Sequence, residues 1–189
     1  MASRMMPPSQ PDYDKGPAGL GIISSFFSLA TISVFLRLYV RLKNHAHGWD
    51  DYFIYASWIM AVYNQVVFAF LTKYGMGRHY EYILPTMPNL IETFVIGELG
   101  FHVAIGLLRI SICKFVLRLT QGTHPRTRTA LYITLSLNGA VTLAAVFTIG
   151  FQCQPLRKIW TPMIEGTCIN RQIFTNIMTV VGGMLPHPK

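Results

Sequence analysis

Long apolar runs without charged residues divide the chain and predict helices that cross a membrane. A helix needs about 20 apolar residues to cross about 30 Å of hydrocarbon. Runs of this kind cover residues 19–40, 52–72, 94–117 and 131–151, and a shorter apolar segment covers 173–186. The pattern therefore predicts an all-α, multi-pass transmembrane helix bundle with four complete helices and an incomplete fifth.

The polar start of the chain differs in character from the rest. Residues 1–17 contain prolines and charges, which is typical of a disordered tail. The apolar run that follows is longer than the 7–15 residues of a signal-peptide core. We therefore expect a tail over 1–17 and one transmembrane domain over 18–189.

Composition supports a lipid environment. Hydrophobic residues make up 51% of the chain and charged residues only 13%, about half the usual charged share of a soluble protein. This excludes a soluble globular domain, and the aromatic content excludes global disorder. The formal net charge is +8, but the basic residues lie between apolar runs rather than in one patch, so we expect the lipid bilayer as partner and no nucleic acid.

The orientation in the membrane follows from how densely the basic residues are packed. Each side of the membrane would hold seven Lys or Arg residues, so the count alone does not decide. The loops after the first and third runs are short and densely basic, which favours a cytoplasmic location for both and an external tail. Arg37, near the end of the first run, is expected to reach the lipid headgroups.

Two cysteines lie in the loop after the fourth run, whereas Cys113 lies inside the third. If that loop is external it matures in an oxidising compartment, where Cys153 and Cys168 are expected to form a disulfide. The alternative is a pair of free thiols facing the cytosol.

The segment from His45 to Asp51 contains two histidines and two carboxylates, which are possible metal ligands. Asp50 and Asp51 directly precede an apolar run, however, where carboxylates cap a helix and favour its positive end. We therefore prefer a helix cap, with Trp49, Tyr52 and Tyr55 as interfacial aromatic anchors, and expect no metal.

A glycine-containing turn, residues 74–79, follows the second run. Gly75 and Gly77 permit a tight turn, but the strand and helix of a phosphate-binding loop are missing from the pattern. The expected role is a turn that presents Arg78 and His79 on the outer side.

The third run is the unusual one because it contains ionisable residues. Glu98, His102 and Arg109 fall within about 40° on a helix, whereas Ser111 and Lys114 lie off this stripe. Such groups avoid lipid, so the stripe should face the bundle interior or a water-filled cavity. Two interpretations remain open, a self-satisfied polar network with partners such as Asn64, Gln65 or Asn138, and a ligand-binding or proton-linked site.

No catalytic constellation is apparent. The sequence lacks a nucleophile and base in a recognisable order, and it lacks paired carboxylates and metal-ligand spacings such as HExxH. We therefore expect no enzymatic activity, no catalytic residues and no cofactor. A membrane enzyme would need further ligands around His45 and His47.

Five short motifs occur in order along the chain, namely Arg37–Arg41, Gly48–Tyr52, Tyr74–His79, the Arg109-Ile110-Ser111 triplet, and Phe151–Pro155 with Trp160 and Gly166–Cys168. In this order they resemble the fungal rhodopsin-like family of seven-helix membrane proteins. The resemblance spans roughly residues 18–180 and only the first four or five of the seven helices. Thr179-Val180 departs from the Thr-Asp that the family usually has in the fifth helix.

The resemblance implies a receptor-like protein, a fragment of the seven-helix architecture, that senses an external cue at the plasma membrane. Partners would be an unidentified extracellular ligand and intracellular signalling proteins. Any retinal-binding lysine would lie in the two last helices of the family, so light sensing is not supported. The alternative is a transporter or proton-coupled carrier that uses the polar stripe, although we find no internal repeat.

Overall fold

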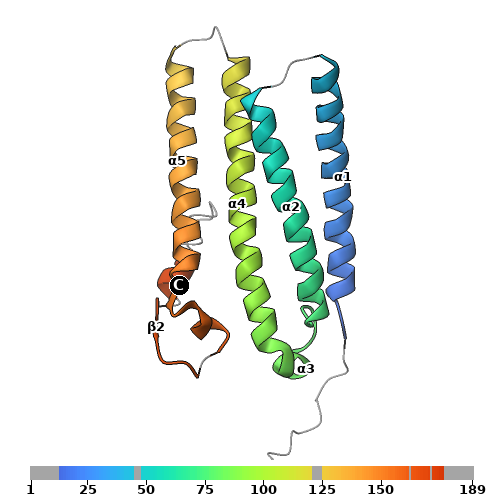
Figure 1. Cartoon of the computed structure of the whole chain (residues 1–189), viewed down its shortest axis with the longest axis vertical. Helices are drawn as coiled ribbons and strands as arrows, with labels where there is room; N and C mark the ends of the chain where they lie inside the picture. Colours follow the sequence, from blue (N-terminus) through green and yellow to red (C-terminus); the bar gives the residue numbers. More distant parts are fainter. Residues whose placement is uncertain (1–12, 45–47, 121–124, 162, 171, 177–189) are drawn as a thin grey trace, which may run out of the picture.

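Four long helices run up and down side by side in a computed structural model of the chain (Figure 1). The structure describes residues 13–44, 48–120, 125–161, 163–170 and 172–176. The long helices are α1 (Gly16–Lys43), α2 (Trp49–Lys73), α4 (Met87–Leu119) and α5 (Pro125–Gly150). Each is long and apolar enough to cross a membrane. The fold confirms the prediction of an all-α multi-pass bundle.

The helices extend beyond the apolar runs that predicted them. A short helix α3 (Tyr80–Ile83) and a 3-10 turn η1 (Leu84–Thr86) lead directly into α4, so the third helical segment begins well before the expected residue 94. Pro85 and Pro88 do not stop this segment because proline is tolerated in the first turn of a helix.

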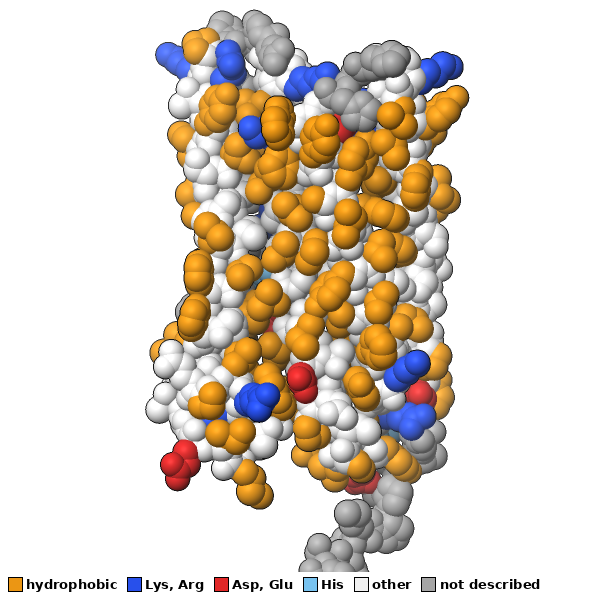
Figure 2. Space-filling view, viewed as in Figure 1, with side chains coloured by type: hydrophobic (Ala, Val, Ile, Leu, Met, Phe, Trp, Pro, Cys, Tyr) orange, Lys and Arg blue, Asp and Glu red, His pale blue; other side chains and the backbone are white. Residues whose placement is uncertain are grey.

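The two ends of the bundle differ in charge. We call the end where α1 and α4 finish and α2 and α5 begin the basic end, and the other the hairpin end. Figure 2 shows apolar side chains spread along the length of the visible face, basic side chains at the basic end and both signs at the hairpin end. Large apolar residues such as Phe35, Leu36 and Phe147 are more than half exposed. Such a surface suits a bilayer, where the exposed side chains meet lipid tails.

Small residues allow α4 to approach its neighbours closely. A Cβ on Gly100 would lie 2.4 Å from the Tyr63 ring of α2, and one on Gly106 would lie 2.5 Å from Thr142 of α5. Ser57 of α2 also donates a hydrogen bond to the Ala104 carbonyl of α4 at 3.0 Å. Without a hydrophobic driving force inside lipid, such close packing and interhelical hydrogen bonds hold the helices together.

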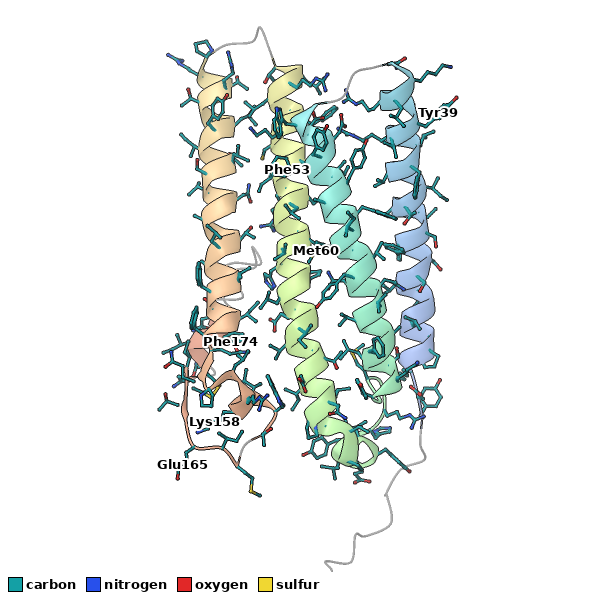
Figure 3. All side chains as sticks on the ribbon, viewed as in Figure 1. Tyr39, Phe53, Met60, Lys158, Glu165 and Phe174 are labelled. Carbon is teal, nitrogen blue, oxygen red and sulfur yellow. A yellow bond between two sulfur atoms is a disulfide. The ribbon has the colours of Figure 1, made fainter. Side chains whose placement is uncertain are left out.

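After α5 the chain forms a compact loop at the hairpin end. Strands β1 (Cys153–Gln154) and β2 (Thr167–Cys168) pair antiparallel, with the 3-10 helix η2 (Leu156–Ile159) between them. Cys153 and Cys168 are joined by a disulfide, the pair expected from the sequence. Lys158 and Glu165 lie in this loop (Figure 3), and the Lys158 ammonium donates to the Gly166 carbonyl. The short strand pair was not predicted.

Some expectations fall on segments outside the described residues. These are most of the tail at 1–12, the histidines at 45 and 47, and the end of the fifth apolar segment at 177–189. Within that last segment, the described residues 173–176 are helical.

Candidate functional site

A cavity of roughly 800 Å³ lies among α1, α2 and α4. Its wall is mostly aliphatic and aromatic, which is common for small-molecule sites of about 300–1,000 Å³. Glu98 and His102 of α4 both line it, together with Ser57, Asn64 and Gln65 of α2. A few polar groups in an apolar wall are the usual means of orienting a bound molecule.

The two ionisable residues of the cavity interact through one turn of α4. The His102 Nδ1 lies 2.9 Å from the Glu98 carbonyl oxygen. A carbonyl oxygen only accepts, so Nδ1 carries the hydrogen in this contact. The Glu98 carboxylate makes no ion pair or hydrogen bond with any residue that the structure describes.

The amides expected to complete a network with Glu98 donate elsewhere. Asn64 donates to the Met60 carbonyl and Gln65 to the Ser24 hydroxyl of α1. Asn138 donates to Thr134 within α5 and does not line the cavity. The self-satisfied network proposed from the sequence is therefore not the arrangement found.

Arg109 does not join the other two members of the stripe. It shares their face of α4 but is not among the residues lining the cavity. No residue in the described ranges forms an ion pair with it. It lies about 16 Å along the helix from Glu98. Of the three residues in the predicted stripe, Glu98 and His102 therefore form one site and Arg109 lies apart from it.

A cluster of buried charges joins three helices at the basic end. The side chains of Asp50 and Asp51 are 4% and 0% exposed. Arg37 of α1 donates to both, at 2.7 Å to Asp50 and 2.9 Å to Asp51. Arg41 lies within 3.6 Å of both carboxylates, and Arg118 of α4 lies 3.4 Å from Asp50. We call these five residues the charge cluster.

The charge cluster corrects the expectation for Arg37 and adds a second role to the helix cap expected at Asp51. Arg37 does not extend toward the headgroups, because two carboxylates hold it against α2 and it lies over the Phe115 ring at 5.0 Å. Asp51 does act at the helix start, accepting from the Gly48 N–H at 3.0 Å, yet it is also the most deeply buried ion-pair partner. The Asp50 and Asp51 carboxylates are thus occupied by guanidinium groups.

The neighbouring motif residues fit around the charge cluster. A Cβ on Gly48 would lie 2.3 Å from the Asp50 carboxylate and 2.6 Å from the Arg118 guanidinium, so only glycine leaves room. Ser111 of α4 is 2% exposed and donates to the Asp50 carbonyl at 2.8 Å. The Gly48–Asp51 and Arg109–Ser111 motifs, far apart in sequence, therefore meet at one point.

The aromatic residues near this point divide into two groups. Trp49 and Tyr52 are 77% and 62% exposed, as membrane-interface anchors would be. Tyr55 was expected to join them, but its hydroxyl is buried and has no hydrogen-bond partner in the described part of the chain. Tyr55 follows Asp51 by one helical turn, and this spacing directs it toward the bundle interior.

The glycine turn at the hairpin end holds the start of α1. Gly75 and Gly77 have φ angles of 98° and 103°, a region that side chains rarely adopt. A Cβ on Gly77 would lie 2.5 Å from the Gly16 nitrogen. Arg78 pairs with Asp14 at 3.2 Å, whereas His79 precedes α3 and is exposed. The turn therefore packs against the start of α1 and also forms an exposed loop.

Sequence reasoning missed the aromatic wall of the cavity and the charge cluster. Five phenylalanines line the cavity, at positions 26, 27, 68, 94 and 101, but an apolar residue in a membrane span carries no signal of which side it faces. The charge cluster did have a signal. Basic residues end one span and acids begin the next, and antiparallel neighbouring helices bring these positions to the same end.

Most of the chain matches a known protein family. Neither a search of curated proteins nor a search of solved structures found a significant match. A family model described as the fungal rhodopsin domain matches residues 36–183, well over half of the chain. That range holds α2, α4, α5 and the disulfide loop, and the chain therefore belongs to the fungal rhodopsin domain family and is a receptor-like, multi-pass membrane protein.

Proposed function

We propose that this protein senses an external chemical cue by binding a small molecule in the cavity among α1, α2 and α4. The cavity itself carries the proposal, because it combines an apolar wall with two ionisable side chains at a depth where such groups are costly. We place the protein in the plasma membrane with the hairpin end outside, and we expect no enzymatic activity.

Three helices connect the cavity to the basic end of the bundle. The three helices that line the cavity are the same three that the charge cluster joins at the basic end. A molecule that changes the spacing of α1 against α2 and α4 would alter the geometry of the charge cluster. Intracellular signalling proteins would then detect the change at the adjoining loops.

Blocking the cavity tests the proposal. Ala61 lines the cavity, so Ala61→Phe fills part of it, whereas Val66 on the same helix does not line it and is 51% exposed. Val66→Phe is therefore the matched control. A fluorophore on a cysteine introduced at Asn44, in a Cys113→Ser background, reports movement at the basic end of α1 while small amphipathic molecules are added outside intact cells.

We expect a response that survives Val66→Phe and disappears in Ala61→Phe. A reporter that never responds, or that responds equally in both variants, would contradict sensing through this cavity. Saturable uptake of the same molecules into vesicles, blocked by Ala61→Phe, would instead identify a carrier.

A further inference from the structure

We propose that the cavity takes a small organic ammonium ion with an apolar, aromatic-sized body. The inference rests on the proposed function in using the same cavity, and it adds the chemical class of the ligand. Three independent features lead to it, namely the hydrogen-bonding capacity of the polar groups, the charge of the wall and the aromatic residues.

The polar groups of the cavity are left mainly as acceptors. Ser57 donates its hydroxyl hydrogen to the Ala104 carbonyl, and Asn64 and Gln65 each donate one of their two amide hydrogens to the protein and keep a carbonyl oxygen as acceptor. His102 uses Nδ1–H on the Glu98 carbonyl, which makes Nε2 an acceptor in the neutral ring. The ionised Glu98 carboxylate has acceptors only. A ligand that satisfies these groups must therefore bring its own N–H or O–H donors.

Charge selects among the possible donors. Glu98 is the one carboxylate among the lining residues, and that lining contains no Lys or Arg. A carboxylate in a span is expensive unless it is paired, and this one has no ion-pair partner among the described residues. An ammonium supplies positive charge and up to three donors at once. A neutral alcohol supplies one donor and no charge.

The wall suits the rest of such a ligand. Five of the lining side chains are phenylalanines. Two of them, Phe94 and Phe101, come from α4 and lie about one helical turn before and after Glu98. The face of an aromatic ring attracts a cation, more strongly when water is excluded. The volume of roughly 800 Å³ leaves room for an apolar body beyond the ammonium group.

The test uses three molecules that differ only at one end, 2-phenylethylamine, 2-phenylethanol and 3-phenylpropionate. Binding is measured by calorimetry on the full chain in phosphatidylcholine nanodiscs, with empty discs subtracting partition into lipid. Glu98→Gln removes the charge from the cavity. Glu92→Gln removes one from the same helix outside the cavity and is the matched control.

We expect the amine to bind wild type more tightly than the alcohol, and the acid not to bind. Glu98→Gln should weaken the amine about 10- to 100-fold, as loss of a hydrogen bond to a charged group does, while Glu92→Gln changes it less than twofold. Equal binding of amine and alcohol by wild type, or an amine affinity unchanged by Glu98→Gln, would overturn the proposal. The first comparison holds even if the Glu98 variant does not fold.

Phosphatidylethanolamine added to the discs distinguishes two sources of the ammonium group. Competition with 2-phenylethylamine would assign the site to a lipid headgroup, and lack of competition to a soluble amine, with the ammonium class supported in both cases. The outcome is also separable from that of the proposed function. Glu98-dependent amine binding without a response at the Asn44 reporter would support the ligand class and contradict sensing, and a reporter response to the alcohol alone would do the reverse.

Discussion

Replacing Asp51 by Asn removes the most buried charge of the charge cluster with almost no change in shape. The Asp51 side chain is fully buried, accepts from Arg37 at 2.9 Å and from the Gly48 N–H at 3.0 Å, and lies 3.5 Å from Arg41. Asn keeps one acceptor oxygen but no negative charge. Three guanidinium groups would then share one carboxylate, Asp50.

The expected loss of stability is large for a single substitution. Removing one partner of a buried ion pair costs about 3–5 kcal/mol because the remaining charge is left unpaired. At about 2–4 °C per kcal/mol for a chain of this size, Tm should fall by on the order of 10 °C. Asp14→Asn is the matched control, since Asp14 pairs with Arg78 at 3.2 Å but both side chains are partly exposed. An exposed pair contributes about 0–1 kcal/mol.

The protein contains its own reporter for the measurement. Cys113 is free and buried in α4, so a maleimide dye reacts with it only as the helices separate on heating. Curves in identical nanodiscs compare wild type, both Asp variants, Arg37→Gln and the Arg37–Asp51 double variant. The double variant should cost clearly less than the sum of the single ones, because the two residues share one interaction.

Two results would refute the reasoning. One is an Asp51→Asn shift no larger than that of Asp14→Asn, which would mean that burial does not strengthen this cluster. The other is strict additivity of Arg37→Gln and Asp51→Asn, which would mean that the pair at 2.9 Å is not coupled.

Three further predictions concern the ends of the bundle. Peptide mapping without reduction should recover Cys153 linked to Cys168, and reduction should cost about 3 kcal/mol for this 15-residue separation; both thiols alkylated before reduction would contradict it. A glycosylation sequon inserted in the 43–49 loop should stay unmodified, because we expect that loop in the cytoplasm, and modification would reverse the orientation. Gly77→Ala should lower Tm, since φ is 103° and the new Cβ would meet α1. Gly21→Ala, with open space around it, should not lower Tm, and equal effects of the two substitutions would contradict close packing of the glycine turn against α1.

The sequence predicted the helices well because their length and apolar character are imposed by the bilayer itself. A run such as 52–72 has few alternatives to a spanning helix once the backbone must satisfy its own hydrogen bonds in lipid. The cysteine pair was likewise expected from its place in one loop. These features depend on local composition, which a single sequence displays directly.

The sites were harder to predict because they depend on which helix faces which. Arg37 was treated as a lone charge against the headgroups, and its true partners are 13 and 14 residues away on the next helix. Arg109 shares a helical face with Glu98, yet helical phase says nothing about where a cavity ends. Tyr55 has the side chain of an interfacial anchor, and its spacing from Asp51 indicates an inward direction only once Asp51 is known to be buried.

The charge cluster also bears on how the chain enters the membrane during synthesis. Four of its five charges belong to α1 and α2, which are joined by the short link at 44–48 and emerge one after the other. Two arginines and two aspartates neutralise each other within this helical pair, so the pair can leave the insertion machinery as one unit with no net charge to bury. Arg118 and Ser111 are synthesised later, with α4. Both contact Asp50 of α2, which the arginines of α1 already hold in place. We therefore expect the order of synthesis to be an order of assembly, in which the first helical pair forms before the third spanning helix packs against it.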